Sequence, residues 1–190
     1  MSHTVDALVD VGRSRRCFLR RAAGCAGLLL TPLGAAGAQA SAVRRLSFVH
    51  LRTGETLVAE YCRNGVYQPD CLAQVNRFLR DFPSGEVHLI DVRLLDILYE
   101  LQVLADREAP YEVISGYRSP QTNAALRRIS SRVAAHSLHM DGRAIDLRMT
   151  GFLTRRLRDF ALSLRSGGVG FYPRSDSLHL DTGRVRTWAG

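Results

Sequence analysis

The spacing of apolar residues predicts short strands and helices over most of the chain after residue 41. Alternation of apolar and polar residues predicts strands at residues 46–51, 56–61, 111–115, 143–149, 168–172 and 177–180. Apolar residues three and four positions apart predict helices at residues 71–79, 94–104, 119–126 and 153–164. Asp91 and Ser119 are expected to cap the second and third of these helices, with Pro120 in the first helical position. This order predicts an α+β fold with a small, mainly antiparallel sheet and helices packed around it.

Length and composition favour one globular domain. The chain has 190 residues, of which 46% are hydrophobic and 23% are charged. These values are ordinary for a folded domain and exclude disordered, collagen-like and disulfide-scaffold classes. No internal repeat or low-complexity linker follows Ser41. We therefore expect residues 41–190 to form a single domain.

The first 40 residues have the pattern of an export signal. Ser14-Arg15-Arg16 is a twin-arginine motif, and a weakly apolar stretch over residues 22–38 follows it. Ala38-Gln39-Ala40 then offers small residues for cleavage before Ser41. The apolar stretch is interrupted by Gly and Pro, so a stable membrane span after cleavage is not expected. The pattern predicts a twin-arginine signal peptide at residues 1–40 and a periplasmic or other extracytoplasmic location.

The positive charge alone does not indicate a nucleic-acid partner. The formal net charge is +8, and all 26 basic residues are arginines. Residues 1–40 contain five arginines and two aspartates, so the remainder, with 21 arginines and 16 acidic residues, carries +5. Because an exported domain does not meet the chromosome, we expect no nucleic acid among its partners.

Two cysteines remain after the signal peptide. Cys62 and Cys71 enclose a short segment that contains Asn64-Gly65. In an oxidising compartment they are candidates for a disulfide, which would contribute about 2–3 kcal/mol by reducing the entropy of the unfolded chain. A two-thiolate metal site is the alternative, but no further Cys or His lies nearby.

Three side chains after residue 135 are candidate metal ligands. In the strand predicted at residues 143–149, alternation places Ile145 and Leu147 on the core face and Asp146 on the opposite face. Gly142 allows a tight turn that brings His139 back over that opposite face. His179 likewise alternates with apolar neighbours in the strand at residues 177–180.

If these two strands are neighbours, His139, Asp146 and His179 converge on one point. Two imidazoles and one carboxylate form a three-ligand zinc set with a fourth position open, as in catalytic zinc sites. Such a site needs a base near the bound water, for which Asp176, three residues before His179, is the candidate. Arg118 can offer a planar guanidinium to a carboxylate or to the oxyanion that develops during hydrolysis.

These residues carry a family resemblance. The pattern Ser137-x-His139-x-x-Gly142-x-Ala144-x-Asp146, with the later His179, resembles the zinc signature of the M15 D-alanyl-D-alanine peptidase superfamily. Three further segments resemble the murein endopeptidase K (YcbK-like, DUF882) branch: Gly116-Tyr117-Arg118-Ser119-Pro120, Gly167-Gly168-Val169-Gly170 and His179-x-Asp181-Thr182-Gly183-Arg184-Val185-Arg186-x-Trp188. The resemblance extends from about Leu46 to Trp188.

The resemblance implies a Hedgehog/D-Ala-D-Ala peptidase-like zinc fold and a peptidase that cleaves peptide cross-links of peptidoglycan. It implies one zinc ion per chain with His139, Asp146 and His179 as ligands, an acidic base three residues before the last His, and a substrate-binding Arg118. Where the wider superfamily has Glu and often an aromatic residue, this chain has Asp176 and Leu178. A shorter carboxylate must lie closer to the metal.

The sequence leaves several alternatives open. Asp181 competes with Asp176 for the role of base, although Asp181 and Ser137 are also candidates for holding ligands in position. His136 either lines the site or lies on the surface. A D,D-carboxypeptidase or dipeptidase, or a wall-binding module with structural zinc, would retain the same ligands. The sequence does not decide the oligomeric state or which peptidoglycan cross-link is cut.

Overall fold

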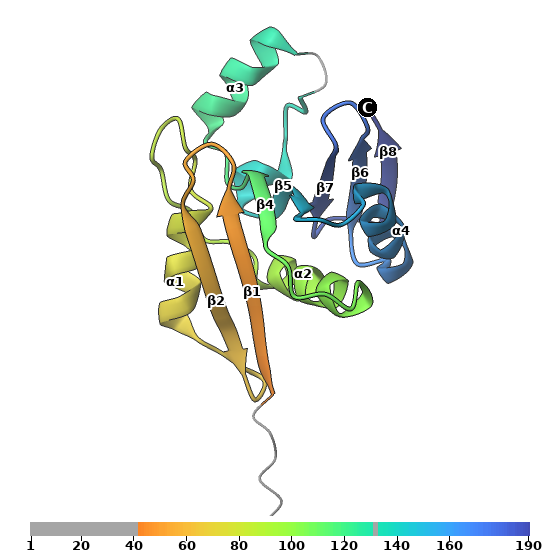
Figure 1. Ribbon diagram of the computed structural model, residues 1–190. Helices are drawn as coiled ribbons and strands as arrows, with labels where there is room; N and C mark the ends of the chain where they lie inside the picture. The colour runs from red at the N-terminus through yellow and green to blue at the C-terminus, as the bar shows by residue number, and fades with distance from the viewer. Residues whose placement is uncertain (1–41, 131–132) are drawn as a thin grey trace, which may run out of the picture. The chain divides into compact units, whose positions relative to one another are not determined.

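The computed structural model describes residues 42–130 and 133–190, which belong to one compact unit, Gln39–Gly190. The elements of the described residues, in chain order, are β1 (Val43–His50), β2 (Thr56–Arg63), β3 (Val66–Tyr67), α1 (Pro69–Phe78), α2 (Val92–Leu104), β4 (Tyr111–Ser115), α3 (Pro120–Ile129), the 3₁₀ turn η1 (Leu138–Asp141), β5 (Ala144–Met149), α4 (Thr154–Leu164), β6 (Gly168–Tyr172), β7 (Ser177–Asp181) and β8 (Arg186–Ala189) (Figure 1).

The strands form one mixed sheet of eight strands in the order β3-β2-β1-β4-β5-β7-β6-β8. The pairs β1–β4 and β6–β8 are parallel, and the other five pairs are antiparallel. The predicted α+β class is confirmed. The expected small, mainly antiparallel sheet is replaced by a larger mixed one, because the chain returns to the sheet centre through α1 and α2 and places β4 beside β1.

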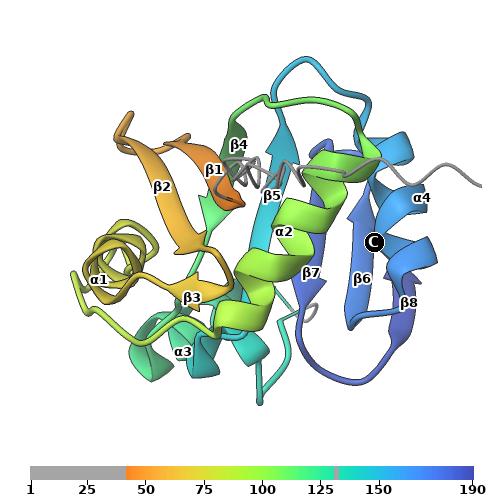
Figure 2. The same cartoon turned by 90° about the horizontal axis from the view of Figure 1, so that it is seen from below.

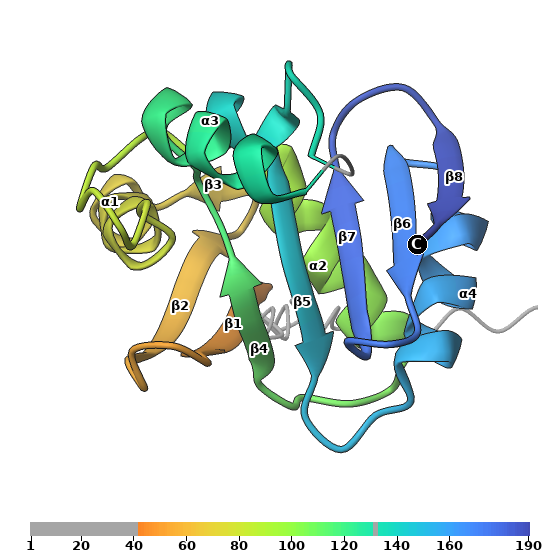
Figure 3. The ribbon, with the colours of Figure 1, turned by 90° about the horizontal axis from the view of Figure 1, so that it is seen from above.

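Helices cover one face of this sheet. Figure 3 shows α2 behind β5 and β7, and Figure 2, from the opposite side, shows it in front of them, with α4 beside β6. Ile145 and Leu147 of β5 and Leu178 and Leu180 of β7 point toward these helices and are at most 1% exposed. In Figure 3, α3 and η1 lie near the upper ends of β4 and β5, and they leave the other face of β5 and β7 accessible. The polar residues of these two strands lie on that face.

The predicted helix caps are confirmed. The Asp91 carboxylate accepts a hydrogen bond from the backbone N–H of Arg93, and the Ser119 hydroxyl oxygen accepts one from Thr122. Pro120 occupies the first turn of α3, where its missing N–H has no partner to lose.

Three short elements were not predicted. β3 has two residues and η1 is a single turn, so neither is long enough to show a period. β8 has the sequence Arg-Thr-Trp-Ala, in which no apolar alternation is visible. Its pairing with β6 therefore depends on tertiary contacts.

The expected disulfide is absent from the structure, in which Cys62 and Cys71 are both free. Cys62 of β2 is buried in the core, and Cys71 of α1 packs against the same core. Both thiols therefore occupy apolar surroundings without forming a bridge, and burial raises the pKa of Cys71.

The predicted signal peptide lies outside the described residues. Among residues 42–130 and 133–190, no helix combines the length and the apolar character needed to cross a membrane.

Leu98 of α2 is fully buried in the core, whereas Leu104 of the same helix is 44% exposed. Leu98→Ala is expected to lower the free energy of unfolding by about 2–5 kcal/mol, because it removes buried apolar contacts and leaves a cavity. Leu104→Ala should change it by only about 0.5 kcal/mol. Denaturant titration of both variants checks the difference, and equal losses would contradict the packing described.

Candidate metal centre

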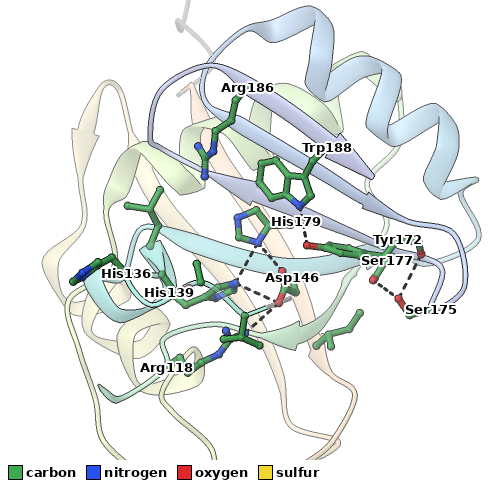
Figure 4. Close-up of a pocket in the computed structure, with 15 residues that line it drawn as sticks. Arg118, His136, His139, Asp146, Tyr172, Ser175, Ser177, His179, Arg186 and Trp188 are labelled. Carbon is green, nitrogen blue, oxygen red and sulfur yellow. Dashed lines mark hydrogen bonds and ion pairs between the residues drawn. The ribbon is translucent and has the colours of Figure 1, made fainter. Parts of the chain in front are cut away.

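Three potential ligands from separate elements meet on the open face of the sheet. His139 belongs to η1, Asp146 to β5 and His179 to β7. One ligand atom from each lies within 4.8 Å of the other two (Figure 4). The Nε2 atom of His139 lies 3.2 Å from Nδ1 of His179 and 3.3 Å from Oδ2 of Asp146, and His179 Nδ1 lies 2.8 Å from Asp146 Oδ1. The structure therefore brings together the three residues that the sequence singled out.

Strand register places two of the ligands opposite each other. β5 and β7 are antiparallel neighbours, and Asp146 pairs directly with His179. The alternation that directs Ile145, Leu147, Leu178 and Leu180 into the core directs both polar side chains to the opposite face. The apolar pattern of the two strands thus determines the position of the site.

The third ligand depends on the turn between η1 and β5. Gly142 ends η1 with φ +65°, a left-handed conformation that glycine adopts without strain. A Cβ atom at this position would lie 2.0 Å from the backbone oxygen of Leu89. Both constraints require glycine here, and the turn lets His139 fold back toward Asp146, as predicted.

The outward nitrogen of each imidazole is held by an acceptor. His139 donates its Nδ1–H to the backbone oxygen of Gly116 at 2.7 Å, and His179 donates its Nε2–H to Oδ2 of Asp181 at 3.1 Å. In the neutral tautomers that these bonds select, the lone pairs of His139 Nε2 and His179 Nδ1 face Asp146. This arrangement presents two nitrogens and one carboxylate oxygen to a common centre.

Asp146 and His179 shift each other's pKa. Burial would raise the pKa of Asp146, but the field and hydrogen bonds of His139 and His179 outweigh burial and hold this pKa well below its usual range. Burial would lower the pKa of His179, but its bonds to Asp146 and Asp181 raise that pKa to about 9. A metal must therefore displace a proton from His179 at neutral pH, so metal affinity is expected to fall as the pH decreases.

Asp181 is fully engaged in holding His179 and its surroundings. Its Oδ1 accepts hydrogen bonds from the backbone N–H groups of Gly168 and Gly183, at 3.1 and 2.8 Å. Arg186 bonds both carboxylate oxygens, at 3.0 and 2.6 Å. Burial would raise the pKa of Asp181, but its hydrogen bonds with His179, Arg186 and Gly183 outweigh burial and lower that pKa. A carboxylate with both oxygens bonded in this way is suited to orienting His179 rather than to accepting a proton from water.

The glycine run of β6 provides space for two side chains from β8. A Cβ at Gly168 would lie 2.4 Å from Arg186 Nη1, and one at Gly170 would lie 2.5 Å from the Trp188 ring. Trp188 packs on His179 with 5.2 Å between ring centroids, and its Nε1–H donates to the Tyr172 hydroxyl at 2.9 Å. The alternating glycines of β6 are the sequence signal for this arrangement.

The three ligands open into a cavity of about 520 Å³, which we call the main cavity. The other side chains that line it include Arg118, His136, Ser137, Tyr172 and Trp188. Arg118 lies beside the ligands, where it donates to Asp146 Oδ2 at 3.5 Å and to the Ser115 hydroxyl at 3.3 Å. The structure therefore places Arg118 beside the ligands, and it places Ser137 and His136 on the lining of the main cavity.

Asp176 is not brought to the site. It lies in the turn between β6 and β7 with φ +45°, is exposed, and does not line the main cavity. Its two neighbours in the chain, Ser175 and Ser177, both line the main cavity, whereas Asp176 does not. Among the described residues, Asp146 is the only carboxylate in the lining of the main cavity.

The donor set fits zinc. Two imidazole nitrogens with hydrogen-bonded N–H groups and one carboxylate oxygen are a common zinc set, and three protein ligands leave a coordination position for water or substrate. His139 is 2% exposed and His179 is 9% exposed, so solvent reaches the centre mainly through the main cavity.

Comparison with known proteins gives one consistent family. Residues 38–188 match the M15 peptidase family described as peptidoglycan L,D-endopeptidase MepK. The chain is 43% identical over 145 residues to proteins of that name from Escherichia coli K12 and Shigella flexneri, covering 76% of this chain and 80% of each relative. It is also 43% identical over 148 residues to the probable peptidoglycan L,D-endopeptidase MepK of Haemophilus influenzae, covering 77% of this chain and 80% of that protein. No solved structure is significantly similar to the chain.

Asp181→Asn is expected to weaken zinc binding about 10–100-fold, because it removes the charge that orients His179 and makes it more basic. Asp176→Asn, which changes an exposed aspartate of the adjacent turn, should leave zinc affinity unchanged. Competition with a chromophoric chelator measures both, and circular dichroism confirms that each variant is folded. Equal zinc affinities of the two variants would contradict the role given to Asp181.

Proposed function

Because the chain belongs to the peptidoglycan L,D-endopeptidase MepK family, we propose that it hydrolyses peptide cross-links of peptidoglycan with one zinc ion bound to His139, Asp146 and His179. The observation that carries the zinc assignment is the convergence of His139 Nε2, His179 Nδ1 and the Asp146 carboxylate on one point. The Hedgehog/D-Ala-D-Ala peptidase-like zinc fold is part of the same proposal.

The three ligands would hold zinc with one coordination position facing the main cavity. Zinc in such a site acts as a Lewis acid and lowers the pKa of a bound water to about 7. Gly116 and Asp181 keep the imidazoles in the tautomers that ligation needs. With Asp146 as the single carboxylate ligand, a zinc-loaded site would keep a net positive charge, which would favour negative charge developing on the substrate carbonyl oxygen.

Arg118 is proposed to bind substrate at the edge of the main cavity. Its side chain is 12% exposed and its guanidinium contacts Asp146 at 3.5 Å, so only part of its hydrogen-bonding capacity is used there. The remaining N–H groups can donate to a substrate carboxylate or to the carbonyl oxygen under attack.

The relatives' name favours one of the two cross-links that the sequence left open. A diaminopimelate–diaminopimelate link joins an L centre to a D centre, whereas a D-alanine–diaminopimelate link joins two D centres. We propose that the chain cleaves the L,D bond, as the name of its relatives states for those proteins.

This substrate agrees with export from the cytoplasm. Peptidoglycan lies outside the cytoplasmic membrane, and the twin-arginine motif and cleavage site of residues 1–40 provide a route to it. We propose a periplasmic location, with residues 41–190 as the mature zinc peptidase domain.

The full-length protein, incubated with zinc and cross-linked muropeptides, is expected to convert dimers into monomers with the addition of one water. Chelation should abolish this conversion, and added zinc should restore it. Mass spectrometry of the products identifies the bond that is cut.

Asp146→Asn is expected to lower kcat in the same assay by at least about 100-fold, because it removes a charged ligand.

The same products separate the alternatives. Release of single terminal D-alanine without loss of dimers would indicate a D,D-carboxypeptidase. Unchanged muropeptides under zinc-replete conditions would reject the hydrolase and favour a wall-binding module.

Asp176→Ala tests the base assigned from the sequence. Because Asp176 is exposed and does not line the main cavity, the variant is expected to keep kcat within about threefold of wild type, which corresponds to a change of about 0.5 kcal/mol. A loss of 100-fold or more with unchanged zinc content would show that the turn brings Asp176 to the bound water during catalysis.

A further inference from the structure

A second cavity of about 240 Å³ adjoins the metal centre on the side of β1 and α3. It shares Ile114, Arg118 and Asp146 with the main cavity. The metal centre therefore lies between two cavities, one toward β7 and β8 and the other toward the β1–β2 turn. An enzyme that cuts within a cross-linked peptide must hold the chain on both sides of the scissile bond.

The second cavity contains an arginine that has no acidic partner. Arg52, in the β1–β2 turn, lies with its guanidinium 5.4 Å from the centroid of the Phe82 ring. Within residues 42–130 and 133–190, Arg52 forms no salt bridge. The nearby Glu55 is already paired with Arg80 at 2.9 Å. Arg52 is thus held against an aromatic ring with its hydrogen-bonding capacity available.

The turn that carries Arg52 is fixed by a buried histidine. His50 is 4% exposed, and its Nδ1 accepts hydrogen bonds from the backbone N–H groups of Arg52 and Thr53, at 3.2 and 3.4 Å. The ring of His50 also packs against Phe82, with 6.2 Å between centroids. These contacts hold the start of the turn and the ring below Arg52 in one arrangement, which reduces the entropy cost of binding a ligand there.

The acidic side chains that line the second cavity have partners of their own. Asp81 is 2% exposed, and its Oδ2 accepts hydrogen bonds from the hydroxyls of Ser84, Ser119 and Thr122, at 2.6 to 2.7 Å. Asp146 faces the two histidines of the metal centre. The groups left to bind a ligand are the guanidinium of Arg52 and the free N–H groups of Arg118, which together favour a carboxylate.

We infer that the second cavity binds the second peptide strand of the cross-link through a free carboxylate of that strand, with Arg52 as the residue that recognises it. This inference rests on the proposed function, because only a cross-linked substrate carries a second strand. Arg118, at the boundary of the two cavities, lies beside the scissile bond. The main cavity then holds the first strand, and Arg52 distinguishes an endopeptidase from an enzyme that trims a single chain end.

The test compares Arg52→Gln with Arg156→Gln in the full-length zinc-loaded protein. Arg156 is a matched control, since it is exposed on α4, stacks on Phe152 at 5.8 Å and lines neither cavity. The substrates are a cross-linked peptide dimer with free carboxylates and the same dimer with its carboxylates converted to carboxamides. Arg52→Gln is expected to lower kcat/KM for the first substrate about tenfold, mainly through KM, the size expected for losing a charge-assisted hydrogen bond.

On the carboxamide dimer, Arg52→Gln should behave like wild type, and Arg156→Gln should do so on both substrates. Equal activities of the Arg52→Gln and Arg156→Gln variants on the free-carboxylate dimer would overturn the inference while leaving the proposed function intact. Equal losses on both dimers would also overturn it, because they would indicate a structural role for Arg52. Wild-type protein that cleaves neither dimer would reject the proposed function, and the inference with it.

Discussion

The metal centre depends on two hydrogen bonds that point away from it. The backbone oxygen of Gly116 and the carboxylate of Asp181 each accept the outward N–H of one histidine, so that His139 and His179 present lone pairs to the same point beside Asp146. Without these acceptors either ring could rotate or adopt the other tautomer, and three nearby side chains would not form a ligand set. Several other residues of the site hold these two acceptors in place.

Asp181 is held by backbone, by Arg186 and by the shape of β6. Gly168 and Gly170 omit the side chains that would occupy the positions of Arg186 and Trp188, and Arg186 in turn bonds both oxygens of Asp181. The carbonyl of Gly116 belongs to the segment between β4 and α3, and Asp81 holds the end of this segment and the start of α3 by accepting bonds from the hydroxyls of Ser119 and Thr122. Residues far apart in the sequence therefore converge on two acceptors, and both regions also border a cavity in which the proposed substrate would lie.

Much of this site could be predicted from the local pattern of apolar and polar residues. Alternation in β5 and β7 separated Asp146 and His179 from the core residues, and Gly142 indicated the turn that returns His139 to them. The residues that contact the two histidines through long-range packing could not be predicted from this local pattern. The Gly116 carbonyl is a backbone group with no side-chain signal, and β8, which supplies Trp188, lacks alternation. Asp176 was expected at the start of the strand that holds His179, whereas it lies in the turn before β7 with a left-handed φ and does not line the main cavity. The parallel pairing of β1 with β4 was likewise invisible, because it depends on how the chain returns through α1 and α2.

Diffraction from crystals grown with zinc, recorded on both sides of the zinc absorption edge, tests the central claim most directly. The account predicts one anomalous peak per chain, coordinated by Nε2 of His139, Nδ1 of His179 and a carboxylate oxygen of Asp146, with the outward imidazole nitrogens still bonded to Gly116 and Asp181. A peak at other residues, coordination through the outward nitrogens, or no peak at saturating zinc would contradict it.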